Sequence, residues 1–191
     1  MRTFVSGLLV GILIIPVLVV LIVATGHLPT ATADSPFPFE RTIAGVALHA
    51  RIRRLAPKRD VSSLTTANLV SGANVYQKNC AFCHGLPDQT KPLLATGMFP
   101  PPPQLFMAGD GVTDDPAGEV YWKVKNGIRL TGMPAFQASL SDEQMWEVTA
   151  LVVRADKLPI EAFELLKPAP SASATSEGAA PPAQAPVNPD K

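Results

Sequence analysis

Few residues of this chain can carry chemistry, since it has two cysteines and three histidines among 191 residues. A structural zinc site takes about four ligands, usually as two pairs, and no second Cys or His pair is present. Basic and acidic residues number 16 each, so the overall charge gives no sign of a nucleic-acid partner. No candidate nucleophile or acid/base pair stands out. We therefore expect neither an enzyme nor a nucleic-acid-binding protein.

Both cysteines lie in the stretch Cys80-Ala81-Phe82-Cys83-His84. Two thiols at this spacing can each add to a vinyl group of one porphyrin, and an imidazole directly after the second Cys can bind the iron. The alternatives are structural thiols, a disulfide, or a thioredoxin-type redox pair, and the redox pair would leave His84 unexplained. The motif predicts one covalently bound haem c, held by Cys80 and Cys83, with His84 as an axial iron ligand.

A six-coordinate haem iron needs a second axial ligand opposite His84. Met133 is the strongest candidate, because Pro134 biases its backbone towards an extended conformation and so displays it from a loop. The long segment between His84 and Met133 also allows the chain to reach the other face of the haem. Met145 is expected in a helix core, and His49 on a linker helix outside the domain. The full set of candidates is Met98, Met107, Met133, Met145, His27 and His49.

The N-terminal segment from Phe4 to Ala24 is almost wholly apolar, and about 20 such residues can cross a bilayer core as a helix. We therefore expect residues 1–26 to be a transmembrane anchor. A signal sequence cleaved after Ala33 is the alternative, because Ala31-Thr32-Ala33 resembles a signal-peptidase site. Haem is attached to such motifs outside the cytoplasm in bacteria. The expected location is the bacterial cytoplasmic membrane, crossed once, with the haem domain on the periplasmic side.

Three further regions follow the anchor. Residues 27–61 are expected to form a spacer and a juxtamembrane amphipathic helix. Residues 62–160 lack the period-two alternation of strands, which predicts an all-α domain of about three or four short helices with long loops. Residues 161–191 are rich in Pro, Ala and Ser and are expected to be disordered.

Local signals place three helices in the compact domain. Helical periodicity covers residues 66–79 and leads into the haem motif. Asp115 as N-cap and Pro116 at the first helical position predict a helix that ends near Gly127. A capping box that begins at Ser141 predicts the last helix.

Together these motifs resemble class I cytochromes c, and more narrowly the membrane-anchored monohaem members found in bacteria. The matching residues are Ala73-x-x-Tyr76-x-x-x-Cys80-x-x-Cys83-His84-Gly85, Tyr121-Trp122-x-x-x-x-Gly127, Gly132-Met133-Pro134 and Trp146.

The resemblance implies that fold around one haem c, with Cys80 and Cys83 as thioether attachment points and His84 and Met133 as axial ligands. It also implies that the first and last helices of the domain cross closely, with Gly72 and Tyr76 facing the region of Trp146. In this family a proline carbonyl after the haem motif often accepts a hydrogen bond from the proximal imidazole. Several prolines compete for that role here.

Ligation by His and Met would leave the iron no open position, which suits one-electron transfer through an exposed haem edge. We expect an electron carrier, attached to the membrane by its N-terminal helix, that serves redox partners such as an oxidase, a dehydrogenase or a soluble cytochrome. The alternative is a fixed haem c subunit of a larger respiratory membrane oxidoreductase. A haem enzyme or gas sensor is a third alternative, and it would need an open iron position.

Overall fold

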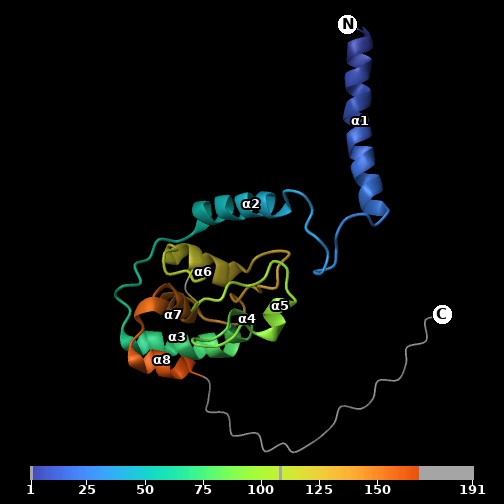
Figure 1. Ribbon diagram of the computed structural model, residues 1–191. Helices are drawn as coiled ribbons and strands as arrows, with labels where there is room; N and C mark the ends of the chain where they lie inside the picture. The colour runs from blue at the N-terminus through green and yellow to red at the C-terminus, as the bar shows by residue number, and fades with distance from the viewer. Residues whose placement is uncertain (1, 108, 168–191) are drawn as a thin grey trace, which may run out of the picture.

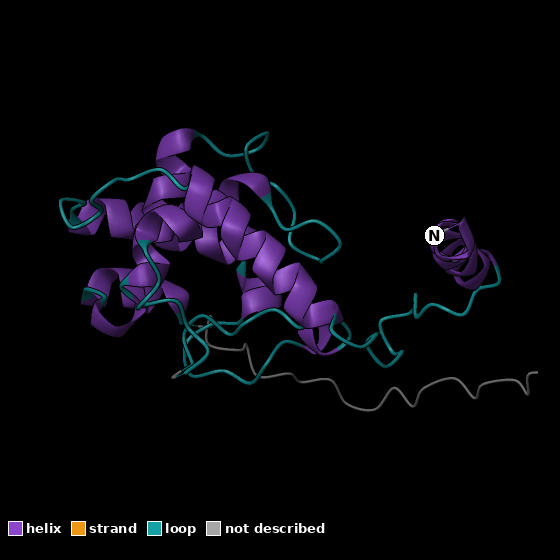
Figure 2. Cartoon of the chain, turned by 90° about the horizontal axis from the view of Figure 1, so that it is seen from above, coloured by secondary structure: helices purple, strands orange, loops and turns teal. Residues whose placement is uncertain are grey.

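The computed structural model describes residues 2–107 and 109–167, and within them all regular secondary structure is helical (Figures 1 and 2). The all-α class is therefore confirmed for the described part of the chain. Its elements are α1 (Arg2–Ala24), α2 (Glu40–Leu55), α3 (Thr66–Asn79), α4 (Ala81–His84), α5 (Leu93–Thr96), α6 (Ala117–Asn126), α7 (Asp142–Val153), the 3-10 helix η1 (Ala155–Lys157) and α8 (Ile160–Leu166).

The core of the domain lies where α3 crosses α7 (Figure 1). A Cβ atom on Gly72 of α3 would lie 2.4 Å from the carbonyl oxygen of Glu147 in α7, so the two backbones are in direct contact. Glu147 is almost fully buried there, and its carboxylate accepts hydrogen bonds from Asn68 and Ser71 of α3. The expected close crossing of these helices at Gly72 is confirmed.

Two aromatic pairs connect the elements of the domain. Trp146 of α7 stacks on Tyr121 of α6, with ring centroids 4.0 Å apart. Tyr76 and Phe106 form a T-shaped pair, at 5.1 Å between centroids, and the buried Tyr76 hydroxyl donates a hydrogen bond to the Gly85 carbonyl at 2.7 Å. Tyr76 thus ties α3 to the segment that follows the haem motif.

The helix starts follow the sequence signals with one change. Ser141 and Gln144 form the expected capping box at the start of α7. Pro116, rather than Asp115, is the N-cap of α6. Asp115 is instead paired with Lys123 at 2.9 Å.

The domain extends beyond residue 160, so the prediction of disorder from residue 161 is wrong for the first part of that segment. Pro159 is the N-cap of α8, and Ala162 and Leu166 of this helix are fully buried in the core. Apolar residues at helical spacing give the segment a face that packs on α3. Residues 168–191, the rest of the predicted tail, lie outside the described residues.

The N-terminal segment is helical, and its large apolar side chains from Ile12 to Val23 are between 46% and 67% exposed. Within the part of the chain that the structure describes, none of the helices combines the length and apolarity needed to cross a bilayer. The transmembrane helix expected at residues 1–26 is therefore not confirmed.

The helix expected to be a juxtamembrane linker packs on the domain. α2 lies across α6 (Figure 1), and Ile52 in its last turns is fully buried. A Cβ atom on Gly118 of α6 would lie 1.8 Å from the Pro57 carbonyl oxygen, so the chain that leaves α2 touches α6 directly. Near the start of α2, the Arg41 guanidinium lies over the Phe99 ring, 4.9 Å from its centroid.

Substitution of Gly72 tests the crossing of α3 and α7. We expect Gly72→Ala to lower the free energy of unfolding by about 1–3 kcal/mol, because the new methyl group would overlap a backbone oxygen that cannot move freely. Gly45→Ala in α2 is the matched control, since no atom lies within 4 Å of its Cβ position. It should leave stability unchanged or raise it by up to about 1 kcal/mol. Urea denaturation of the full-length protein measures both, and equal stabilities would contradict the crossing.

Candidate functional site

A cavity of about 260 Å³ opens beside the haem motif, and most of the side chains that line it are apolar. Cys80, Cys83, His84 and Met133 all line it. The structure therefore brings the four predicted site residues together around one space, although they come from two distant parts of the chain.

The short helix α4, together with Cys80 as its N-cap, presents the first three of these residues. The Cys80 carbonyl accepts hydrogen bonds from the backbone N–H groups of Cys83, at 3.1 Å, and His84, at 2.9 Å. Gly85 ends the turn with φ of +73°, a conformation that glycine adopts without strain. The tight turn places two thiols and one imidazole along the same cavity, which is the arrangement that attachment of one porphyrin requires.

The His84 imidazole is held in a defined orientation. Its Nδ1 atom lies 2.8 Å from the Pro103 carbonyl oxygen, and because a carbonyl can only accept, Nδ1 must carry the proton. Nε2 is then the atom that remains for a metal, as in most metal-binding histidines. Burial lowers the pKa of His84, while the Pro103 carbonyl and Asp110 act in the opposite direction, and a neutral imidazole is the form that binds iron.

Gln104 fixes the loop that supplies this carbonyl. Its side chain is almost fully buried, and its Nε2 donates to the carbonyls of Cys83, at 3.2 Å, and Pro102, at 3.1 Å. Its backbone N–H donates to Asp110 at 2.7 Å. Sequence reasoning missed Gln104 and Asp110. A lone polar residue directly after a proline run was the one available signal for Gln104.

Three of the six candidates for the second axial ligand line the cavity, namely Met98, Met133 and His49. Of the others, Met145 is buried in the core as expected, at 3% exposure, and Met107 is exposed. His27 is exposed beyond the end of α1. The expectation that His49 lies outside the domain is wrong, because α2 is packed against the domain instead of projecting from it.

Met133 lies in a loop that hydrogen bonds hold beyond the end of α6. Its N–H donates to the Thr131 hydroxyl at 3.2 Å, and its carbonyl accepts from the N–H of Ile128 at 3.2 Å. The Met98 side chain lies on Gly132, where an added Cβ would be 2.0 Å from the Met98 methyl carbon. The loop that precedes the proline run therefore touches the loop that carries Met133.

Both cysteines are free thiols in surroundings that disfavour the thiolate. Burial raises the pKa of Cys80 to about 12, and burial also raises the pKa of Cys83. A redox-active dithiol relies on a lowered thiol pKa. The electrostatic setting of this pair is therefore unlike that of a thioredoxin-type site.

The sequence model of a family described as cytochrome c oxidase, cbb3-type, subunit III matches residues 67–152. The matched stretch runs from the first turn of α3 to the last turn of α7, and it includes the four predicted site residues. It leaves out α1, α2 and α8. No curated protein matches the chain significantly.

The role of Gln104 leads to a stability prediction. We expect Gln104→Leu to lower the free energy of unfolding by about 1–3 kcal/mol, because two carbonyls lose their donor in a place with little access to water. Gln137→Leu is the control, since Gln137 is also a loop glutamine but is exposed, and it should change stability by less than about 0.5 kcal/mol. Thermal and urea unfolding measure the difference. A Gln104 variant as stable as the Gln137 variant would show that the hydrogen bonds of Gln104 do not contribute to stability.

Proposed function

Residues 67–152 form a class I c-type cytochrome domain that binds haem c, and from this we propose that the protein carries single electrons on one covalently attached, His/Met-ligated haem. The observation that carries the proposal is the hydrogen bond from His84 Nδ1 to the Pro103 carbonyl at 2.8 Å. It leaves Nε2 of a neutral imidazole for the iron, next to two thiols on the same cavity wall.

The residues present fit the cofactor. Cys80 and Cys83 would each form a thioether to the porphyrin, and the cavity offers the apolar lining that a porphyrin ring needs. When bound, haem c supplies a reversible one-electron change at its iron. The protein holds His84 in place through Pro103 and closes the neighbouring loop through Gln104, so the site should change little between the two redox states.

We propose Met133 as the second axial ligand. It lines the same cavity as His84, and the hydrogen bonds of its loop fix its backbone. Met98 also lines the cavity, but its segment leads directly into the proline run 100–103. The carbonyl of the last of these prolines, Pro103, accepts the hydrogen bond from His84. That connection ties Met98 to the His84 side, whereas Met133 belongs to the loop beyond α6. Two protein ligands leave the iron without an open position, which favours electron transfer over catalysis or gas binding.

The setting we propose is the outer face of a bacterial cytoplasmic membrane. The apolar run of residues 4–24 and the exposure of the large side chains from Ile12 to Val23 support attachment there. Redox partners would be an oxidase, a dehydrogenase or a soluble cytochrome. Phe82, between the two cysteines, is 58% exposed and also lines the cavity. A small apolar surface next to the haem suits the brief contacts of electron-transfer proteins.

A second candidate function is a fixed haem c subunit of a larger respiratory oxidoreductase. The description of the matching family, an oxidase subunit, favours it. The chemistry at the haem would be the same in both cases. The two functions differ only in whether the protein leaves its partner between electron transfers.

Replacement of the methionines tests the axial ligand. We expect Met133→Ala to lower the reduction potential and to open the iron to carbon monoxide, because loss of the thioether removes the ligand that stabilises ferrous iron. Met98→Ala and Met107→Ala are the controls and should keep the wild-type spectrum. Spectroelectrochemical titration measures all three, and acid–acetone should leave the pigment on every variant because the thioethers remain. A wild-type spectrum and potential in Met133→Ala would show that another residue is the second axial ligand.

Extraction from the native host separates carrier from subunit. If the protein is a tethered carrier, it should stay with membranes washed in carbonate and then migrate alone on native electrophoresis after mild detergent treatment. If it is a fixed subunit, it should migrate in a stoichiometric complex that contains further redox centres. Release by carbonate alone would contradict the proposed attachment through the N-terminal segment.

A further inference from the structure

The helix α2 lies outside the matched cytochrome domain, yet it forms part of the wall of the haem cavity. Leu48 and His49 line the cavity together with the haem motif. Three contacts hold α2 in place: burial of Ile52, the touch of Pro57 on Gly118, and the stacking of Arg41 on Phe99. These contacts fix both ends of α2 against the domain, so the helix is an ordered part of the cavity wall.

The position of α2 determines which edge of the porphyrin it meets. The cysteines on α4 would bind the vinyl-bearing edge, and the two propionates leave the ring from the opposite edge. Figure 1 shows α4 beside α3 on one side of the domain and α2 on the far side, beyond α6. Because one cavity is lined both by the cysteines and by α2, a ring tethered at α4 would point its propionates towards α2.

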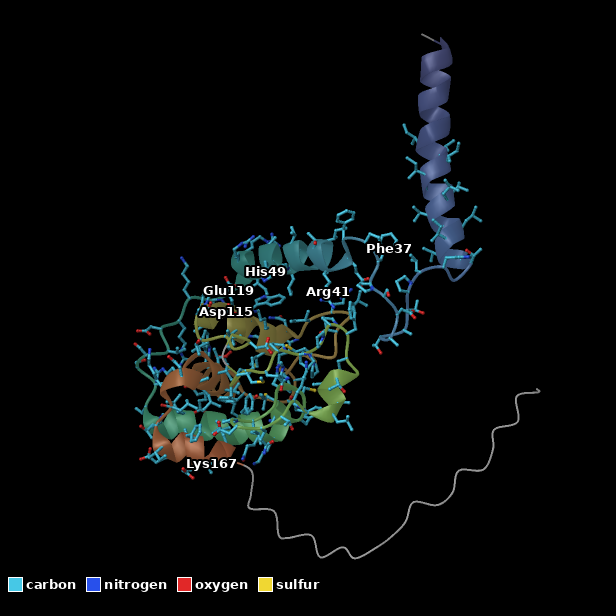
Figure 3. All side chains as sticks on the ribbon, viewed as in Figure 1. Phe37, Arg41, His49, Asp115, Glu119 and Lys167 are labelled. Atoms are coloured by element: carbon cyan, nitrogen blue, oxygen red, sulfur yellow. The ribbon has the colours of Figure 1, made fainter. Side chains whose placement is uncertain are left out.

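His49 is the residue of α2 suited to meet them. Its Nδ1 lies 2.7 Å from the Gly45 carbonyl oxygen of the same helix, so Nδ1–H is the donor there and Nε2 is left for another partner. Figure 3 shows His49 on the side of α2 that faces the domain. Among the residues that the structure describes, His49 and Lys123 are the cavity-lining side chains, apart from His84, that can carry positive charge. Lys123 is paired with Asp115 at 2.9 Å.

We propose that α2 covers the propionate edge of the haem and that His49 donates a hydrogen bond from Nε2 to a propionate. The proposal rests on the haem attachment proposed above. In this arrangement the imidazolium has both N–H groups engaged, one with Gly45 and one with the carboxylate. A positive charge beside a propionate offsets its negative charge, and so favours the ferrous over the more positive ferric iron.

Potentiometry of full-length His49 variants tests this arrangement. His49→Leu removes the charge and the donor, and it should shift the ferrous/ferric equilibrium about threefold to tenfold towards ferric iron. A tenfold shift corresponds to a reduction potential lower by ~59 mV for a one-electron couple. His49→Lys restores a cation on a longer stem and should recover most of the potential. His27→Leu replaces an exposed histidine that does not line the cavity, and it should have no effect.

The outcomes separate this inference from the proposed function. A His49→Leu potential equal to that of His27→Leu, with haem attached and Met133→Ala behaving as expected, would overturn the role of His49 alone. Loss of the six-coordinate spectrum in His49→Leu would also overturn it, because His49 would then be an iron ligand. If the wild-type protein carried no covalent haem, the proposed function itself would be contradicted. Circular dichroism that matches wild type shows that a potential shift does not come from a loss of helix.

Discussion

The hydrogen bond between His84 and the Pro103 carbonyl is the interaction on which the rest of the site depends. It joins the short helix that carries the cysteines to a loop that has no regular structure of its own. Proline at each of positions 100–103 stiffens that loop, and Gln104 ties it back to the Cys83 carbonyl. The carbonyl is therefore already in place in the polypeptide, so the imidazole would need little reorganisation to bind the iron of the proposed haem.

The sequence predicted the elements that local chemistry determines. The capping box at Ser141 located the start of α7, and the spacing of Cys80, Cys83 and His84 predicted a turn that places all three side chains along one cavity. The sequence could not predict contacts between distant segments. Several prolines competed for the His84 hydrogen bond, and only the folded path of the loop selects Pro103. The helix α8 was missed because the Pro- and Ala-rich composition of the tail masked a short apolar face.

The same limit applies to the second axial ligand. Sequence context ranked Met133 above Met98 through Pro134 and chain length, but both side chains line the cavity. What distinguishes them physically is the connection of their loops, one to the proline run and the other to the end of α6. Gly132 allows the two loops to touch, since any side chain there would displace Met98. Gly132 belongs to the Gly132-Met133-Pro134 motif, and the close packing of the two loops explains why a glycine stands there.

The helix α2 shows why periodicity alone could not place it. Its outer face carries Ile43 and Val46, about two-thirds exposed, while its inner face buries Ile52. Ile43 and Val46 at helical spacing predicted an amphipathic helix on a membrane surface or a linker, and only the fold shows that the opposite face meets the domain. Its place over the cavity also bears on electron exchange. If α2 covers the propionate edge as we propose, the edge beside the exposed Phe82 would be the one left for a redox partner.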